Sequence, residues 1–352
     1  MSDSIIPDGI KINQRKILVN LEFITCDKSY EYEVSLNTEE KDHENTYSLS
    51  EHIKVNVGRS WDTIVNRSDT EIEVNGLENL KLTSGSMTPC LAFIFSLVSD
   101  KETLDRLKPV REYLKNIHYY PIDEPSGVKP TDIKNFVVDS DVYFKWLSEF
   151  QSSPDPECSV IMKLIHMWKD KEEKFEELKS LLGQNGLSII NDIRIDSLSL
   201  PHALGKIPKE EQTYYFVNFY PSLESDKISK VLRYHDLSYG TRRLLRMLTA
   251  ILHDESTLLL LEQPEDSIHS GLLNKLVPLL TTYVDPSQFV VTSHSSGIIN
   301  NLKAKDIRLV AMKDAKTIVR ALTKVELEVV EAFICEEGTL NDFLESIEIE
   351  DV

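Results

Sequence analysis

The stretch that decides the fold is Leu237-Ser-Tyr-Gly-Thr-Arg-Arg243, followed at residues 257–265 by Thr-Leu-Leu-Leu-Leu-Glu-Gln-Pro-Glu. The first segment leads into an apolar run at residues 244–252, which predicts a helix. The four consecutive leucines of the second segment predict a short strand that is apolar on both faces, as in a parallel sheet between two helix layers. This strand ends in Glu262.

A second strand is expected at residues 288–292, just before Ser293-His294-Ser295-Ser296. The chain between the two strands is long enough for a right-handed crossover helix. Ligands of open α/β sheets bind beyond the carboxyl ends of the strands. We therefore expect Glu262 and His294 to face one crevice at one edge of one sheet. Residues 258–261 and 289–291 should be deeply buried between helix layers.

Three motifs of this region resemble those of ABC-type ATPases. Residues 236–245 are similar to the signature motif, residues 258–269 to a Walker B strand with a D-loop, and residues 290–295 to the switch histidine. The set is most similar to the RecF/OLD/SMC-like branch, whose prokaryotic members are AAA-type core-domain ATPases, often of phage-defence or toxin systems. The resemblance implies an α/β, P-loop-NTPase-like fold with a mixed or parallel sheet, flanking helices, and ATP and Mg²⁺ as cofactors.

The resemblance also gives the motif residues roles. It places Ser238, Gly240 and Arg243 against the γ-phosphate of an ATP molecule held by a partner subunit, where a helix N-terminus also attracts an anion. A glycine is expected where phosphate approaches the backbone, so that Gly240→Asp would spare the fold and weaken nucleotide-dependent association. Glu262 would hold Mg²⁺, and His294 would act as the switch residue.

The loop after the Walker B strand carries the remaining candidates. Gln263 occupies the place of the catalytic glutamate, but an amide can orient a water molecule without accepting its proton. Glu265 and Asp266 lie in the D-loop position, and His269 is expected to pack structurally. Structural alternatives stay open for the other candidates: an N-cap for Ser238, surface charges for Arg242 and Arg243, an exposed strand end for Glu262, acids favoured by a helix dipole for Glu265 and Asp266, and a core histidine for His294.

The phosphate-binding motif G-x-x-x-x-G-K-[ST] of P-loop ATPases is absent from the sequence. The pair Gly205-Lys206 is followed by Ile207, and no glycine lies five residues before it. The P-loop is therefore truly absent, or encoded upstream of the given start, or supplied by another polypeptide. We expect negligible ATP hydrolysis by the chain alone.

Composition limits the partners. The net charge is −19, from 39 basic and 58 acidic residues, which argues against nucleic-acid binding by the whole surface but leaves room for a local basic patch.

Four cysteines without metal-site spacing predict buried free thiols: Cys26, Cys90, Cys158 and Cys335. No signal peptide follows Met1, and no apolar run approaches the roughly 20 residues that span a bilayer. We expect a cytoplasmic protein.

Periodicity divides the chain into four parts: an antiparallel β lobe at 1–85, a helical lobe at 86–185, an ATPase core at 186–335 and an acidic, partly disordered tail at 336–352. The first part contains a predicted hairpin at 17–36 and strands at 53–57, 61–65 and 72–74, the last ending in an Asn75-Gly76 turn. Helices are expected at 87–98, 104–114, 142–150, 160–182 and 324–334. Further strands are expected at 188–195, 214–219, 307–312 and 317–322. Loops are expected at 38–45, 121–130 and 196–212. The charged run 169–177 is either a solvated helix face or the stump of a coiled coil.

Two functions follow. In the first, a RecF/OLD-like ATPase-family protein works as a homodimer or with a subunit or effector that bears the P-loop, and ATP between the subunits gates a defence or DNA-related output. In the alternative, the chain is an inactive pseudo-ATPase that acts as a binding or regulatory scaffold. A nuclease is disfavoured, because no Toprim-like carboxylate cluster follows the core.

Overall fold

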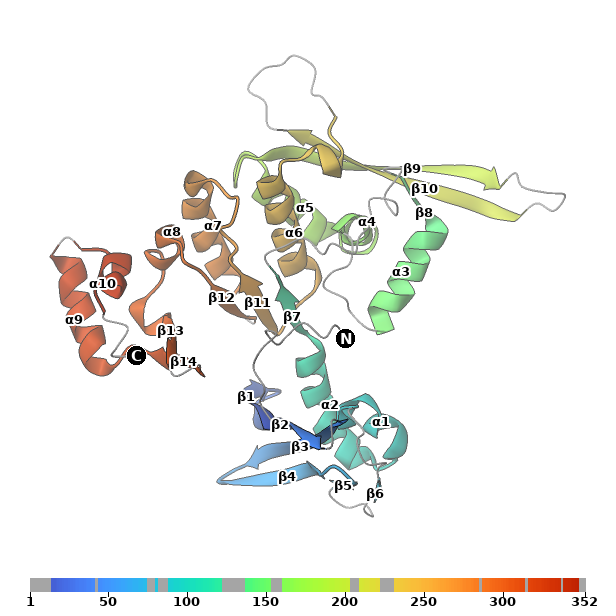
Figure 1. Ribbon diagram of the computed structural model, residues 1–352. Coiled ribbons are helices and arrows are strands. Elements are labelled where there is room, and N and C mark those ends of the chain that lie inside the picture. The colour runs from blue at the N-terminus through green and yellow to red at the C-terminus, as the bar shows by residue number, and fades with distance from the viewer. Residues whose placement is uncertain are drawn as a thin grey trace. The chain divides into compact units, whose positions relative to one another are not determined.

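The computed structural model is shown as a ribbon in Figure 1. It describes residues 14–41, 44–74, 80–81, 88–121, 137–152, 160–202, 209–221, 231–284, 287–313, 316–336 and 338–347. The chain forms two compact units, residues 1–115 and 116–352. The four-part division at residues 85, 185 and 335 stays a prediction. The predicted Asn75-Gly76 turn, most of the predicted loop at 121–130 and Cys158 lie outside the described residues.

The first unit contains a six-stranded antiparallel meander, which confirms that the N-terminal part of the chain is antiparallel β. Its strands follow one another in chain order: β1 (Gln14–Thr25), β2 (Lys28–Lys41), β3 (Glu44–Val57), β4 (Ser60–Arg67), β5 (Glu71–Val74) and β6 (Leu80–Lys81). The predicted loop at 38–45 is wrong, because β2 and β3 continue through it to residues 41 and 44. All eight residues at 38–45 are polar or charged, so composition alone suggested a loop.

The helical segments among the described residues of the first unit are the short η1 (Cys90–Ala92) and α1 (Ile94–Leu97) and the longer α2 (Lys101–Lys115). The single helix predicted at 87–98 is wrong, since Phe93, with φ −127°, separates η1 from α1. The cysteine prediction is partly wrong. Cys90 is buried, whereas Cys26 and Cys335 are exposed.

The second unit contains the predicted parallel sheet, in the order β12 (Gln288–Thr292), β11 (Leu258–Glu262), β7 (Ile117–Tyr120). Helix α6 (Tyr239–His253) precedes β11, and α7 (Ser270–Thr282) is the crossover to β12. Leu259 and Leu261 are buried on one face. The expectation of deep burial on both faces is wrong, because Val290 on the opposite face is 47% exposed and its neighbour in the sheet, Tyr119, 49%. Four leucines in a row do not tell whether the second helix layer lies within the same chain.

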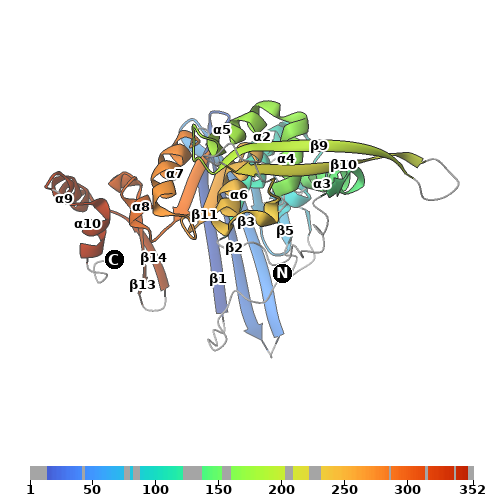
Figure 2. The ribbon, with the colours of Figure 1, turned by 90° about the horizontal axis from the view of Figure 1, so that it is seen from above.

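A second, antiparallel sheet lies beside these helices in the order β8 (Val137–Asp139), β10 (Lys209–Pro221), β9 (Ile190–His202). The predicted loop at 196–212 is wrong, because β9 and β10 extend into it as a long ribbon (Figure 2). Helices α3 (Ser140–Ser152), α4 (Val160–Asp170) and α5 (Glu172–Leu182) pack with this sheet and α6 in one apolar core. The predicted helix 160–182 is divided at Lys171, which has φ −137° and caps α5.

The C-terminal part of the second unit follows the predictions until its last segment. The 3-10 helix η2 (Tyr234–Asp236) precedes α6. The elements after β12 are α8 (Ser296–Ile299), η3 (Ala304–Asp306), the hairpin of β13 (Arg308–Lys313) and β14 (Lys316–Ala321), and α9 (Lys324–Cys335). The expectation of disorder is wrong for helix α10 (Leu340–Ser346), because its buried Leu340 and Phe343 pack on Val330. Among the described residues, no helix is both long and apolar enough to cross a membrane.

Candidate functional site

The ends of β11 and β12 form the centre of the site. The strands run parallel with Glu262 opposite Thr292, and the Gln263 amide donates to the Thr292 carbonyl oxygen at 2.9 Å, which extends the ladder by one residue. The predicted neighbourhood of the two strands is thereby confirmed. His294, two residues beyond Thr292, is exposed at the same edge. Gln263 has a φ of +39°, a left-handed conformation that is costly for a residue with a side chain.

Glu262 has a partner that the sequence did not reveal. The Tyr119 hydroxyl on β7, 143 residues away, donates to Glu262 Oε2. This hydrogen bond raises the pKa of the Tyr119 hydroxyl above its usual value. The sequence signal for β7 is weak: Ile-His-Tyr-Tyr is a four-residue run of residues that favour strands. Glu262 is half-buried, and the Tyr119 hydroxyl is a neutral donor to its carboxylate.

Glu265 ties the two strand ends together. Its Oε1 accepts hydrogen bonds from the Ser293 hydroxyl at 2.7 Å and from the His294 amide at 3.0 Å. Its Oε2 is buried and has no hydrogen-bond partner among the described residues. A buried carboxylate oxygen without a donor is unfavourable, so this atom is suited to accept a cation or a hydrogen-bond donor.

Arg243 of α6 holds the turn that follows β11. Its Nη2 donates to the carbonyl oxygens of Glu262 at 3.0 Å and Gln263 at 2.6 Å, and its Nη1 lies 3.9 Å from Asp266 Oδ2. The side chain is 10% exposed. The guanidinium therefore positions the backbone of the site within the chain, and its predicted contact with phosphate stays a prediction.

The N-terminus of α6 lies beside this turn. Ser238 is exposed and caps the helix by accepting from the Thr241 amide at 3.1 Å. A Cβ atom at Gly240 would stand 2.3 Å from the Ser267 carbonyl oxygen. The expectation that Gly240→Asp spares the fold is therefore wrong, because this glycine permits two backbone segments to pack. His269 caps α7 by accepting from the Gly271 amide at 3.1 Å, which confirms its structural role.

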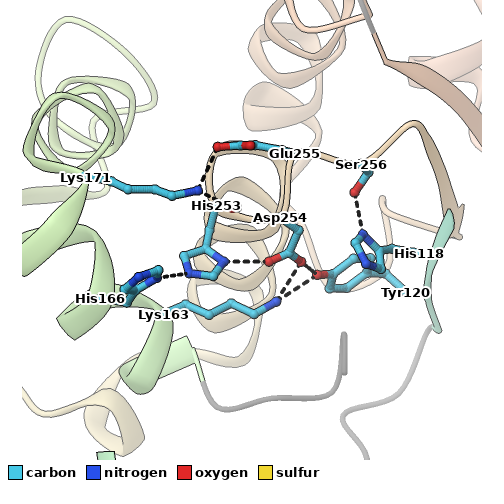
Figure 3. A network of polar contacts seen from close by, with 9 residues as sticks. All are labelled: His118, Tyr120, Lys163, His166, Lys171, His253, Asp254, Glu255 and Ser256. Atoms are coloured by element: carbon cyan, nitrogen blue, oxygen red, sulfur yellow. Dashed lines mark hydrogen bonds and ion pairs between the residues drawn. The ribbon is translucent and has the colours of Figure 1, made fainter. Parts of the chain in front are cut away.

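A buried polar network, which the sequence analysis missed, lies at the other end of α6 (Figure 3). Asp254 accepts from Lys163 of α4 at 2.7 Å, from the Tyr120 hydroxyl, and from His253 Nδ1 at 2.8 Å. His253 Nε2 lies 2.8 Å from His166 Nδ1. Burial raises the pKa of Asp254, but the hydrogen bond from His253 and the charge of Lys163 outweigh it and bring this pKa to about 2. The network fixes α6 to α4 and β7.

Burial has the opposite effect on the histidines of this network. It lowers the pKa of His253 and of His166, and it also lowers the pKa of His118, whose Nδ1 lies 2.7 Å from the Ser256 hydroxyl. Histidines of this kind are neutral at neutral pH. The buried charged pair of the network is therefore Lys163 with Asp254, with neutral histidines around it, and a second pair, Lys171 with Glu255, lies at its more exposed side.

Comparison with protein families gives one match. Residues 131–300 match the family model described as "AAA domain, putative AbiEii toxin, Type IV TA system". The matched range includes every site residue from Ser238 to His294. A search of curated proteins found no match.

Solved structures of similar fold include SMC heads. One, from a study of ATP-driven dimerization and DNA-stimulated activation of SMC ATPases, is 20% identical over 50% of this chain and 96% of that chain, with a TM-score of 0.33. An SMC head bound to the C-winged helix domain of ScpA is 15% identical over 84% and 76%, with a TM-score of 0.36. The SMC head domain from Thermotoga maritima is 12% identical over 84% and 74%, with a TM-score of 0.32. The likeness concerns the fold alone.

Proposed function

Because residues 131–300 of this chain belong to the AAA domain family of the ABC/SMC-like ATPases, we propose that the chain supplies part of a composite ATP site that is completed by a second subunit. In this site the chain contributes the two carboxylates of Glu262 and Glu265, the turn at Gln263 and the exposed His294. The N-terminus of α6 at Ser238 faces the nucleotide held by the partner, where its dipole favours phosphate.

The observation that carries this proposal is the pair of hydrogen bonds from Ser293 and His294 to Glu265. One carboxylate oxygen thereby fixes the loop after β12 against the loop after β11. The other oxygen is buried and without a hydrogen-bond partner among the described residues. A carboxylate held in this way is already positioned for a positively charged ligand, so little ordering is needed on binding.

The donor set suits Mg²⁺. Magnesium in nucleotide sites is bound by one or two carboxylates together with phosphate oxygens and water, and this edge of the sheet presents the carboxylates of Glu262 and Glu265. The described residues contain no cluster of three or more His, Cys, Asp or Glu side chains that could hold a metal without a ligand of another kind. Mg²⁺ would supply charge neutralisation of the phosphates, and Tyr119 would hold the Glu262 carboxylate in its place.

The incomplete sheet supports a contribution from a second subunit. Tyr119, Leu260 and Val290 are register neighbours on one face, and Tyr119 and Val290 are about half exposed. Parallel strands are usually covered on both faces. Strand β12 is also an edge strand within the described part of the sheet. A subunit that bears the missing phosphate-binding loop could cover this face and edge and complete the nucleotide site.

The output of such an assembly would be an on–off contact between subunits. ATP that contacts both subunits binds the associated state more tightly than it binds the separated subunits. This difference in affinity sets how far ATP shifts the equilibrium toward association. We infer that the assembled state gates a toxin or phage-defence effector, in keeping with the family's description as a putative toxin of a toxin–antitoxin system.

The test is binding of a fluorescent ATP analogue with Mg²⁺, measured for the chain alone and with the proteins encoded beside it. We expect no binding by the chain alone and saturable binding with a P-loop-bearing neighbour. Glu265→Gln should weaken that binding about tenfold or more, since it removes a charge from a partly buried site. Equal binding by the chain alone and by each mixture would refute the composite site.

A regulatory scaffold without turnover is the second candidate, and Gln263 favours it. An amide at this place cannot accept the proton of an attacking water. Hydrolysis by the assembled complex distinguishes the two functions, because the scaffold would bind nucleotide without turnover. Gln263→Glu should raise turnover in the first case and leave it at background in the second.

A further inference from the structure

Helix α9 carries an apolar side that is exposed to solvent. Val325, Val329 and Phe333 recur at every fourth residue, so they form one stripe along the helix, here called the α9 stripe. They are 69%, 50% and 37% exposed. Val330, on another side of α9, is buried against α10. A surface helix ordinarily buries its apolar stripe, so a helix that buries one apolar side and exposes a second is suited to a further contact.

The rest of the C-terminal segment holds the α9 stripe in place. Thr323 caps the first turn of α9, and Glu326 accepts hydrogen bonds from Arg320 on β14 at 2.9 and 3.0 Å. At the other end of the helix, the ring of Phe333 lies 5.8 Å from that of Phe343 on α10. The stripe is therefore formed before any partner binds, which lowers the entropic cost of an interaction.

The charge beside the α9 stripe is negative. Glu328 and Glu331 are exposed on one flank, and Glu336 is exposed at the C-terminal end of α9, where the helix dipole adds partial negative charge. Residues 324–336 and 338–347 contain six acidic side chains and one basic side chain. Among the described residues, the one ion pair of these two helices joins Glu326 to Arg320. The acidic flank is thus suited to pair with positive charge on a partner.

We propose that the α9 stripe binds an amphipathic helix of a partner protein, with lysine or arginine side chains beside the apolar side of that helix. From Val325 to Phe333 the stripe is about 12 Å long, at a rise of about 1.5 Å per residue. A ridge of this kind packs into the groove between side-chain rows of another helix. The partner would present apolar residues at i, i+3, i+4 and i+7 to the stripe, and its basic residues to Glu328 and Glu331.

Charge decides against other occupants. Nucleic acids and anionic lipid surfaces are negative, so the glutamates beside the stripe would repel both. A second copy of this chain, which has a net charge of −19, would bring the same acidic flank. Like charges brought together in one interface are unfavourable. A basic amphipathic helix is the partner that satisfies both the stripe and its flank.

This surface is separate from the composite ATP site. It uses α9 alone, which contains neither of the carboxylates Glu262 and Glu265, and no nucleotide takes part in it. A chain that binds no nucleotide would still bind the helix. Failure of the helix to bind would leave the proposed ATP site untouched.

The test is fluorescence anisotropy of a labelled synthetic peptide, titrated with the full chain without nucleotide. The probe is a helix of about 18 residues, long enough to form in water, with leucine at i, i+3, i+4 and i+7 and lysine elsewhere. The control peptide has the same composition in scrambled order, so that it keeps the charge and loses the apolar side. We expect saturable binding of the first peptide and binding about tenfold weaker or more for the second.

Variants of the chain locate the binding. Val329→Ser should raise the dissociation constant about tenfold, because it removes an apolar contact at the centre of the stripe. Val142→Ser is its matched control, at a valine of α3 that is 48% exposed, and it should bind as the wild type does. Both valines are exposed, so neither change disturbs the core.

Charge is tested in the same way. Glu328→Lys should raise the dissociation constant about fivefold, because an attraction becomes a repulsion. Glu112→Lys adds the same charge at an exposed residue of α2 and should have little effect. Equal binding of the scrambled peptide, or wild-type binding by Val329→Ser, would overturn the proposal. Equal weakening by Glu112→Lys and Glu328→Lys would overturn it too, since the peptide would then respond only to the net charge of the chain.

Discussion

Gly240 and Ser267 pack so closely that a Cβ atom on residue 240 would stand 2.3 Å from the Ser267 carbonyl oxygen. The contact joins the first turn of α6 to the loop between β11 and α7. Both partners are backbone, so neither can rotate away as a side chain could. Together with the Arg243 hydrogen bonds to the carbonyls of Glu262 and Gln263, it fixes the first turn of α6 against the carboxylate-bearing loop.

Gly240→Ala should therefore destabilise the protein, because the added methyl group can be accommodated only by moving the loop. Overpacking of this kind costs about 1–3 kcal/mol. The free energy of unfolding from urea titration measures it. Gly297→Ala is the matched control, since the atom nearest to its added Cβ would be the Ser295 hydroxyl at 3.4 Å, an ordinary contact distance. Equal losses in the two variants would contradict a specific contact at Gly240.

The sequence was informative where a local pattern sets the structure. Four leucines followed by a glutamate predicted β11 and its end at Glu262, and residues 288–292 predicted its parallel neighbour. Both elements are strongly apolar and flanked by polar turns, so the pattern is unambiguous. The neighbouring strand β7 is only four residues long, too short to show a period, and with it Tyr119 escaped prediction.

Contacts between distant segments could not be predicted for a different reason. Lys163 and Asp254 lie 91 residues apart, and Lys163 stands in an apolar stretch of α4 where a lysine is expected to reach the surface. Only the fold shows that it is buried. The exposed face with Val290 escaped prediction similarly, because the sequence of a strand does not reveal what covers it.

We expect the chain alone to hydrolyse ATP at no more than background rate. Phosphoryl transfer depends mainly on positioning and clamping the phosphates, and the sequence contains no phosphate-binding loop. A phosphate-release assay with Mg²⁺ measures this. Turnover that persists through purification and is abolished by Glu262→Ala would contradict the prediction. Turnover that survives Glu262→Ala would instead indicate a contaminating enzyme.

Breaking the buried ion pair of Lys163 with Asp254 should be costly. Lys163→Met leaves the carboxylate buried and without its charged partner, which costs about 3–5 kcal/mol of unfolding free energy. The double variant Lys163→Met/Asp254→Leu removes both charges and should recover part of the loss. Lys174→Met is the control, because its pair with Glu177 is exposed and should contribute at most about 1 kcal/mol. A double variant as unstable as the sum of its single changes would contradict the pairing.

The ionised Asp254 also sets the protons of the neighbouring histidines. Because the carboxylate only accepts, His253 carries its proton on Nδ1, and its Nε2 accepts from His166 Nδ1–H. A second proton on His253 would put two N–H groups face to face between α6 and α4. The other ring nitrogen of His166, Nε2, lies 3.7 Å from Asp170 Oδ2. A second proton on His166 would therefore lie beside the Asp170 carboxylate.

Stability should consequently fall in mild acid. Burial lowers the pKa of His253 and His166 in the folded protein below the value of about 6.5 found in unfolded chains. The unfolded chain then binds more protons than the folded protein below that pH. The unfolding free energy is therefore at its full value above about pH 6.5, and it decreases as the pH falls toward the folded-state pKa values. Urea titrations from about pH 7.5 to about pH 5, a range that spans the unfolded-state pKa of about 6.5, measure the slope. His166→Gln should reduce this slope, while His235→Gln, at an exposed residue outside the network, serves as the matched control. An unchanged slope in His166→Gln would show that the acid sensitivity arises elsewhere.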